Sequence, residues 1–184
     1  AAIRKAQSIT DAAFLEILDF IKPGKTEKEV AAYLEYCMRR LGADGLAFET
    51  IAAGGPNSAK PHAVPGDRPL RQGDFFTMDY GAYWGGYCSD MTRTFFCETA
   101  DPDYAAIHAL VRSANEKAES LIRPGVRFCD LDKAARDVIS EAGYGEYFTH
   151  RLGHSIGMQA HEAGDVSQGN PTEIQEGMTF SIEP

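Results

Sequence analysis

The chain has 184 residues, of which 43% are hydrophobic, and it carries a formal net charge of −9 at pH 7. This size suffices for one compact domain with a core of its own. A net negative surface repels phosphate backbones, which argues against nucleic acid as a partner, and no apolar run approaches the roughly 18 residues that a membrane-spanning helix needs.

Two helices are predicted in the first quarter of the chain. Apolar residues recur at helical spacing from the first residues onwards, and Pro23-Gly24 ends this first helix. Thr26 and Glu29 have the spacing of a capping box, in which each side chain accepts a hydrogen bond from the other residue's backbone N–H. The second helix therefore begins at this box, and Gly42 ends it.

An antiparallel hairpin with two acidic residues is predicted next. Residues 74–83 and 86–96 both alternate between the two faces of a strand, and a turn is expected between them. If that turn is centred on residues 84–85, Asp79 and Asp90 face each other across the hairpin. Two carboxylates so close repel each other unless one is protonated or a cation lies between them.

Carboxylate oxygens suit hard divalent cations, and a pair of them can bridge two ions. The alternative is a pair of solvated aspartates on an exposed face. The neighbours of Asp79 and Asp90 are aromatic and β-branched, which favours the cation site.

The second half of the chain repeats the landmarks of the first. Two more helices follow the hairpin, and the second of them ends at Gly143, 101 positions after Gly42. The Pro-Gly break at residues 23–24 recurs at residues 124–125, again 101 positions later. In each half, the pattern therefore predicts a helix, a Pro-Gly break, a second helix and strands, in that order. We expect an α+β domain with a pseudo-two-fold repeat, in which helices pack on one face of a largely antiparallel sheet.

The repeat also relates the acidic residues. The run at residues 76–79 recurs at residues 180–183, so that Glu183 corresponds to Asp79. The counterpart of Asp90 would then follow Pro184. We expect residues 1–184 to be one domain whose C-terminal strands, with one further acidic residue, lie outside this sequence.

Three of the five histidines fall within twelve residues, at His150, His154 and His161. Glycines flank His154 and would let the backbone approach a ligand closely. The spacing differs from the HExxH of a helical zinc site. Beside a candidate acid cluster, such a group favours a functional site. His62 lies in a loop just before the hairpin and is a weaker candidate.

The four cysteines form no CxxC pair, and their spacing resembles no zinc-binding motif. We interpret them as small thiols in a reducing environment and expect a cytoplasmic protein.

Five short motifs stand out: D-Y-G at residues 79–81, S-D-M-T-R-T-F at 89–95, H-R-L-G-H-S-I-G at 150–157, H-E at 161–162 and S-I-E-P at 181–184. Together they resemble the pita-bread metallopeptidases, which include methionine aminopeptidase, aminopeptidase P, prolidase and creatinase. The resemblance covers essentially the whole chain and implies the pita-bread fold. The motifs K-P-H-A and S-D-M-T-R-T look more like the proline-specific branch, aminopeptidase P and prolidase.

The resemblance implies a set of metal ligands. Asp79, Asp90, His154 and Glu183 match four of the family's five ligand positions, and the fifth, a glutamate, matches nothing before the sequence stops. The implied cofactor is a pair of divalent metal ions. Manganese is our first expectation, with cobalt, iron or zinc as alternatives.

The resemblance also implies roles for other residues. His62 and His161 match the family's pair of catalytic, substrate-binding donors, and Glu183 is expected to act as proton shuttle as well as ligand. His150 is expected to line the substrate pocket. Ser155 departs from the glycine that is common there and adds a hydroxyl next to the expected ligand histidine.

The implied function is metal-dependent hydrolysis of the first peptide bond in small peptides with proline at the second position. The domain would be truncated at its C-terminus and would lack the N-terminal domain usual in that branch, so the fragment itself is expected to be weakly active or inactive. The family often dimerises, which allows a homodimer. The alternatives are a methionine aminopeptidase, a creatinase-like hydrolase that works without metal, and a non-catalytic relative that binds protein partners.

Overall fold

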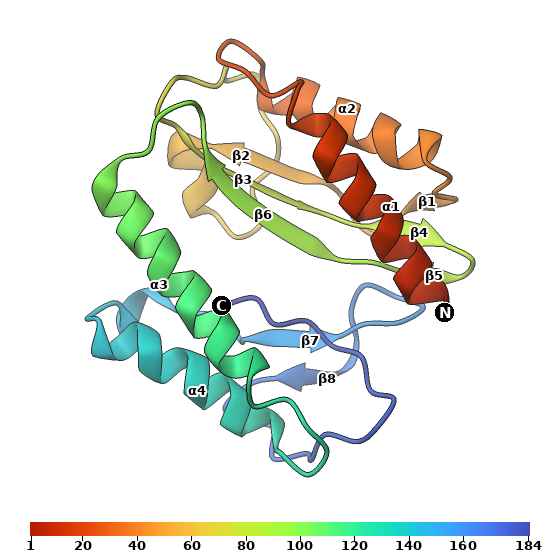
Figure 1. Cartoon of the computed structure of the whole chain (residues 1–184), viewed down its shortest axis with the longest axis vertical. Helices are drawn as coiled ribbons and strands as arrows, with labels where there is room; N and C mark the ends of the chain where they lie inside the picture. Colours follow the sequence, from red (N-terminus) through yellow and green to blue (C-terminus); the bar gives the residue numbers. More distant parts are fainter. The chain divides into compact units, whose positions relative to one another are not determined.

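The computed structural model describes residues 1–184, which divide into two compact units. The first unit comprises Ala1–Asp101 with Gly157–Ala160, and the second comprises Pro102–Ile156 with His161–Pro184. None of the helices combines the length and the apolar character that crossing a bilayer requires. Figure 1 labels the elements of both units.

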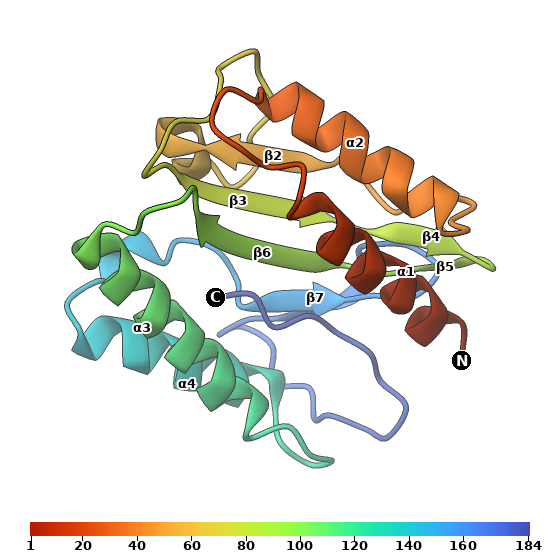
Figure 2. The same cartoon turned by 45° about the horizontal axis from the view of Figure 1, so that its top comes forward.

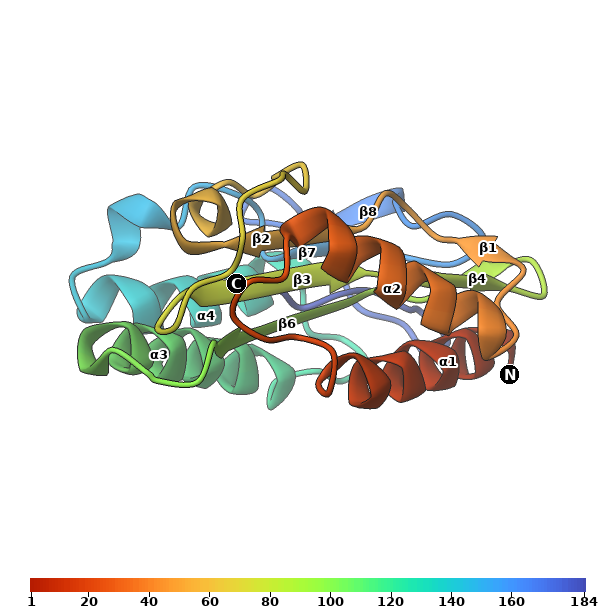
Figure 3. The ribbon, with the colours of Figure 1, turned by 90° about the horizontal axis from the view of Figure 1, so that it is seen from above.

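The first unit contains α1 (Ala2–Ile17), α2 (Glu27–Arg40), β1 (Gly45–Leu46), β2 (Ile51–Gly54), the 3-10 helix η1 (Gly55–Ala59), β3 (Phe75–Tyr80), β4 (Ala82–Trp84), β5 (Tyr87–Cys88) and β6 (Met91–Phe96). Its strands form two antiparallel three-stranded sheets, in the orders β1-β4-β5 and β2-β3-β6. Figure 2 shows β2, β3 and β6 in this order, and Figure 3 shows α1 and α2 side by side along the unit.

The core of the first unit lies between the two helices and one face of β3. Along β3, Phe76, Met78 and Tyr80 are fully buried and pack with residues of α1 and α2. The alternate residues Thr77 and Asp79 are half-buried on the other face. The predicted alternation is therefore confirmed, and it places Asp79 on the face of β3 opposite the helices.

The capping box predicted for α2 is present. The backbone N–H of Thr26 donates to Glu29 Oε2 at 2.8 Å, and the N–H of Glu29 donates to Thr26 Oγ1 at 3.1 Å. Helix α1 ends at Ile17, earlier than the Pro-Gly break that was expected to end it. The turn that follows brings the Phe20 ring onto Tyr33 of α2, with centroids 4.2 Å apart, and this contact favours leaving the helix early.

The turn of the hairpin is shifted by one residue from the prediction. Trp84 pairs with Tyr87, so the two central residues are Gly85 and Gly86, with φ of +56° and +86°. A two-residue turn of this kind requires positive φ at both central positions, which glycine adopts at little cost. Trp84 at a central position would be strained, and this decides the register.

The prediction that Asp79 faces Asp90 is therefore wrong. Asp79 pairs with Thr92 in β6, and Asp90 immediately precedes that strand. The same register holds on the turn side, where the Ser89 N–H donates to the Ala82 carbonyl at 2.9 Å. Asp90 thus lies diagonally from Asp79, at a distance of about 7–8 Å in an ordinary sheet.

The two predicted hairpin strands are each interrupted once. The first breaks at Gly81, between β3 and β4, and the second breaks between β5 and β6. A Cβ on Gly81 would overlap the carbonyl oxygen of Ser89. The Ser89 hydroxyl also accepts a hydrogen bond from the Ala82 N–H at 2.9 Å. The close approach of the two chains here requires glycine.

The second unit contains α3 (Pro102–Glu119), α4 (Phe128–Glu141), the 3-10 helix η2 (Gly145–Tyr147), β7 (Gly153–Ser155) and β8 (Glu162–Val166). The helices α3 and α4 lie side by side (Figures 1 and 2), and β7 pairs with β8 in an antiparallel ladder. The buried core of this unit consists of Ala114, Ala118, Phe128, Leu131, Ala135, Ile139, Phe148, Leu152, Val166 and Ile174.

Matching hydrogen bonds confirm the internal repeat. The N–H of Gly24 donates to the Leu70 carbonyl at 2.8 Å, and the N–H of Gly125 donates to the Ile174 carbonyl at 2.9 Å. In the opposite direction, the N–H of Leu70 donates to the Lys25 carbonyl and the N–H of Ile174 donates to the Val126 carbonyl, both at 2.8 Å. Both glycines have positive φ, +94° and +88°. The Pro-Gly break therefore performs the same structural task twice.

Glu27, at the start of α2, anchors the loop that leads to the hairpin. Its side chain is 1% exposed, and its carboxylate accepts hydrogen bonds from the N–H of Gly54 at 2.7 Å, the N–H of Gly66 at 2.8 Å and the Asn57 amide at 2.9 Å. Because a buried charge must be compensated by donors, the two ends of this loop are held together at Glu27.

We predict that Glu27→Gln lowers the free energy of unfolding by about 2–4 kcal/mol, because the glutamine NH₂ would face backbone donors that lose their acceptor. Urea unfolding measures the effect. Glu35→Gln, on the same helix, is the control and should stay within about 0.5 kcal/mol of the unaltered chain. Equal effects of the two substitutions would contradict the anchoring role.

A second prediction concerns the acid sensitivity of the ion pair between Arg68 and Asp74. The guanidinium contacts both carboxylate oxygens, at 2.7 and 2.9 Å, and the hydrogen bonds from Arg68 hold the pKa of Asp74 below its usual range. Because the pKa of Asp74 is lower in the folded chain than the value of about 3.9 in the unfolded chain, the ion pair stabilises the fold above about pH 3.9. This stabilisation is lost as the pH falls through the pKa of Asp74 in the folded chain.

The substitution Asp74→Asn should therefore destabilise the chain by about 1–3 kcal/mol at pH 7, and the difference should shrink below about pH 4. Urea titrations at a series of pH values test this. A difference that stays constant down to the acid limit would show that the ion pair contributes nothing through its charge.

Candidate functional site

A histidine and a glutamate meet inside the second unit. The Nε2 atom of His154, in β7, lies 3.0 Å from Oε1 of Glu183. His154 is 4% exposed, and Glu183 is half-buried. Within the second unit, the structure therefore brings together two of the four predicted metal ligands, one nitrogen donor and one oxygen donor.

The segment that carries Glu183 runs antiparallel beside β7. The Ser181 N–H donates to the His154 carbonyl and the Glu183 N–H donates to the Leu152 carbonyl, both at 2.8 Å. Gly153 makes this approach possible, because a Cβ there would overlap the Ser181 carbonyl. The glycine next to His154 thus accommodates a neighbouring backbone.

Ser181 forms hydrogen bonds with both members of the pair, and it was not among the residues predicted from the sequence. Its hydroxyl donates to Glu183 Oε1 at 2.7 Å and accepts from the His154 N–H at 2.9 Å. The signal was present in the sequence, since residues 181 and 183 share one face of an extended segment. The sequence does not show, however, that His154 lies opposite these two residues on the neighbouring strand.

The electrostatics of Glu183 favour the ionised form. Burial raises the pKa of this carboxyl, but hydrogen bonds from His154 and Ser181, together with electrostatic interactions with the nearby histidines, outweigh burial and lower it. The group is therefore a carboxylate at neutral pH, as a metal ligand must be.

The orientation of His154 also suits a metal ligand. Its Nδ1 lies 3.2 Å from the Ser155 carbonyl oxygen, to which an N–H can donate. Ligating histidines commonly hold their second nitrogen in this way, which fixes the ring, and a metal ion at Nε2 would replace the proton that Nε2 donates to Glu183. An imidazole nitrogen and a carboxylate oxygen are a donor pair that zinc, iron, cobalt and manganese accept.

The other candidate histidines are exposed. The His161 ring lies 4.0 Å from the His154 ring, measured between centroids. His150 stands four residues before His154, with Nδ1 2.8 Å from the Arg151 carbonyl oxygen. His62 lies in the first unit, within the loop whose ends Glu27 holds.

The two aspartates lie in the first unit. Asp79 is in the central strand β3, between Ile51 of β2 and Thr92 of β6, and it is half-buried. Asp90 is half-buried at the break before β6. Both carboxylates therefore belong to the β3–β6 hairpin, in diagonal rather than facing positions.

Comparison with known proteins extends these observations. The family description Metallopeptidase family M24 matches residues 1–184. The Xaa-Pro dipeptidase of Pyrococcus horikoshii is 43% identical over 182 residues, which are 99% of this chain and 52% of that protein. The chain thus spans about half the length of the curated relatives it matches.

Solved structures are similar as well. The X-Pro aminopeptidase of Thermotoga maritima has a TM-score of 0.96 at 41% identity, over 98% of this chain and 51% of that one. The prolidase of Pyrococcus furiosus has a TM-score of 0.95 at 40% identity, over 98% of this chain and 53% of that one. The α+β pita-bread fold expected from the sequence is confirmed.

We predict that Gly153→Ala separates the Glu183 segment from β7 and lowers the free energy of unfolding by about 2 kcal/mol or more. Hydrogen exchange of the Glu183 amide, which donates to Leu152, reports the separation directly. Gly169→Ala is the control, because a Cβ there meets nothing within 4 Å. Unchanged protection of the Glu183 amide would contradict this account of the glycine.

Proposed function

The chain belongs to metallopeptidase family M24, and on this premise we propose that the protein that carries it hydrolyses the first peptide bond of small peptides with proline at the second position. The His154–Glu183 contact at 3.0 Å carries the proposal, because it unites two ligand types of a metallopeptidase centre. Relatives named Xaa-Pro dipeptidase and prolidase, at 43% and 40% identity, support the choice of substrate.

We propose Asp79, Asp90, His154 and Glu183 as ligands of two divalent metal ions, with a further glutamate outside residues 1–184 as the fifth. Oxygen donors with one imidazole favour manganese as our first choice, with cobalt, iron or zinc as alternatives. When bound, such ions supply a water of lowered pKa and an electrophile for the peptide carbonyl.

The chain's own residues then have separate tasks. Glu183, ionised and bonded to Ser181, accepts a proton and passes it to the leaving proline nitrogen. His161 and His62 donate hydrogen bonds to the oxygen on which negative charge develops. His150 contacts the substrate. The bond before proline lacks an N–H, so a pocket with no acceptor at that point selects it.

We further propose a cytoplasmic location and a small-peptide substrate. The free cysteines, three of them buried, agree with a reducing compartment. Homodimer formation is part of the same proposal and rests on the family resemblance alone.

We predict that Asp90→Ala in the intact protein abolishes stoichiometric metal binding and lowers turnover of an Xaa-Pro dipeptide, with added manganese, at least about a hundredfold. Metal content by elemental analysis and the initial rate are the measurements. Asp67→Ala is the matched control, since this side chain is 83% exposed and pairs only with Lys28 at the surface. Full metal content and rate in Asp90→Ala would remove this residue from the centre.

A substrate panel distinguishes the alternatives. The proposal predicts faster cleavage of Xaa-Pro peptides than of Met-Ala. Preference for Met-Ala would instead identify a methionine aminopeptidase, hydrolysis by a metal-free protein would favour a creatinase-like enzyme, and a protein that binds no metal and cleaves no peptide would favour a non-catalytic relative.

A further inference from the structure

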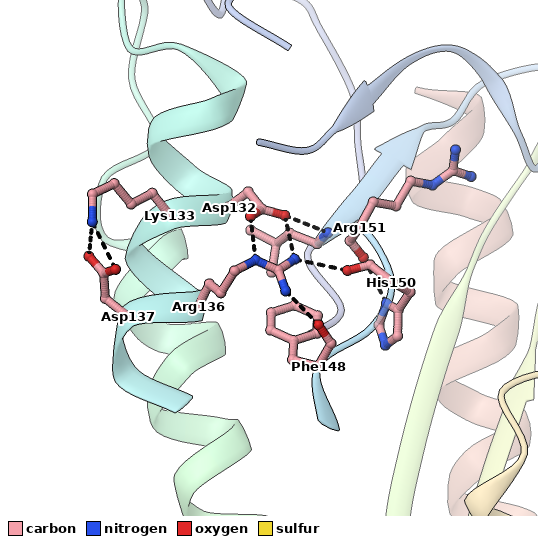
Figure 4. A network of polar contacts seen from close by, with 8 residues as sticks. Asp132, Lys133, Arg136, Asp137, Phe148, His150 and Arg151 are labelled. Atoms are coloured by element: carbon pink, nitrogen blue, oxygen red, sulfur yellow. Dashed lines mark hydrogen bonds and ion pairs between the residues drawn. The ribbon is translucent and has the colours of Figure 1, made fainter. Parts of the chain in front are cut away.

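The segment between α4 and β7 carries His150 and leads directly to His154. Apart from the short helix η2, it has no regular structure that could fix its path. Loops of this kind need side-chain hydrogen bonds to hold their backbone groups. Figure 4 shows that a buried ion pair on α4 provides them.

Asp132 is the buried acid of this ion pair. It is fully buried, and its carboxylate accepts hydrogen bonds from Nε and Nη2 of Arg136, at 2.9 and 3.1 Å. It also accepts a bond from the backbone N–H of Leu152 at 3.1 Å. One carboxylate therefore ties the start of β7 to the middle of α4.

Arg136 holds the rest of the segment. Its Nη1 donates to the Phe148 carbonyl at 2.6 Å, and its Nη2 donates to the His150 carbonyl at 2.9 Å. The guanidinium also lies over the Phe148 ring, 4.0 Å from the centroid. The fork geometry of arginine is what allows one side chain to bond the carboxylate and two carbonyls at once.

The neighbouring pair on the same helix shows what an ordinary surface ion pair looks like. Lys133 and Asp137 have the same four-residue spacing, but their side chains are 70% and 51% exposed, and they contact only each other. They lie on the opposite side of α4 from Arg136 (Figure 4). Such exposed pairs contribute little, whereas breaking a buried pair leaves an uncompensated charge.

The ion pair forms hydrogen bonds with the backbone of His150 itself and with the backbone of the residues two positions before and after it, Phe148 and Leu152. The Leu152 carbonyl then accepts the N–H of Glu183 at 2.8 Å. We infer that Asp132 and Arg136 are positioning residues that hold His150 where it meets the substrate. The inference rests on the proposed function for the role of His150, but the positioning itself does not.

The test compares Arg136→Lys with Lys133→Arg in the intact protein. Lysine keeps the charge and the pairing with Asp132 but cannot bond two carbonyls as well. We expect Arg136→Lys to raise KM for an Xaa-Pro dipeptide about five- to tenfold with kcat within about twofold, the change that the loss of one ordinary hydrogen bond from His150 to the substrate would cause. Lys133→Arg should leave both constants unchanged.

A double-mutant cycle with His150→Ala separates positioning from general stability. If Arg136 acts through His150, Arg136→Lys adds no further rise in KM once the ring is gone. Additive effects, or an unchanged KM in Arg136→Lys alone, would overturn the inference. Phe148→Leu, which keeps the carbonyl and removes the ring that contacts both the guanidinium and the His150 ring, is the milder second variant, and it should raise KM about twofold.

A structural readout keeps the inference testable without activity. In Arg136→Lys, the NMR signal of the His150 ring should shift, and so should the carbonyl-carbon signals of Phe148 and His150, which lose their donor. If the unaltered protein cleaves no Xaa-Pro peptide while both changes occur, the proposed function fails and the positioning stands. If neither changes, the positioning fails whatever the activity.

Discussion

The contact between His154 and Glu183 is the constraint on which the rest of the site depends, because a carboxylate sheltered from water must be matched by donors or by positive charge. The chain meets this demand with fixed geometry. Ser181 bonds both residues, a backbone ladder sets their spacing, and Gly153 lets that ladder form. The same fixed geometry supports the proposed ligand role, because it holds one nitrogen donor and one oxygen donor at a set distance.

The two units share a framework and differ in the groups that act on it. Both use the glycine of a Pro-Gly break, at positive φ, with equivalent hydrogen bonds to a later segment. The buried acids that anchor the functional loops do not repeat. The residue 101 positions after Glu27 is Phe128, and the residue 101 positions before Asp132 is Ala31. A duplicated scaffold has thus acquired separate anchors, each for the loop that carries a candidate histidine.

Sequence reasoning was sufficient where one local pattern decides the structure. The capping box at Thr26, the Pro-Gly breaks and the inward face of β3 all follow from such patterns. It was wrong about the hairpin, because Trp84, Gly85 and Gly86 allow two turn positions and only the demand for positive φ selects one. It could not find Arg136, whose spacing from Asp132 is that of a surface pair. Burial, which tertiary packing decides, gives that pair its role.

Metal content of the intact protein tests the central claim most directly. If His154 and Glu183 are ligands, elemental analysis after dialysis finds about two divalent ions per chain, and Glu183→Gln retains fewer than one, since a neutral amide is a poor substitute for a carboxylate. A Glu183→Gln protein that keeps two ions and full Xaa-Pro peptidase activity would contradict the account.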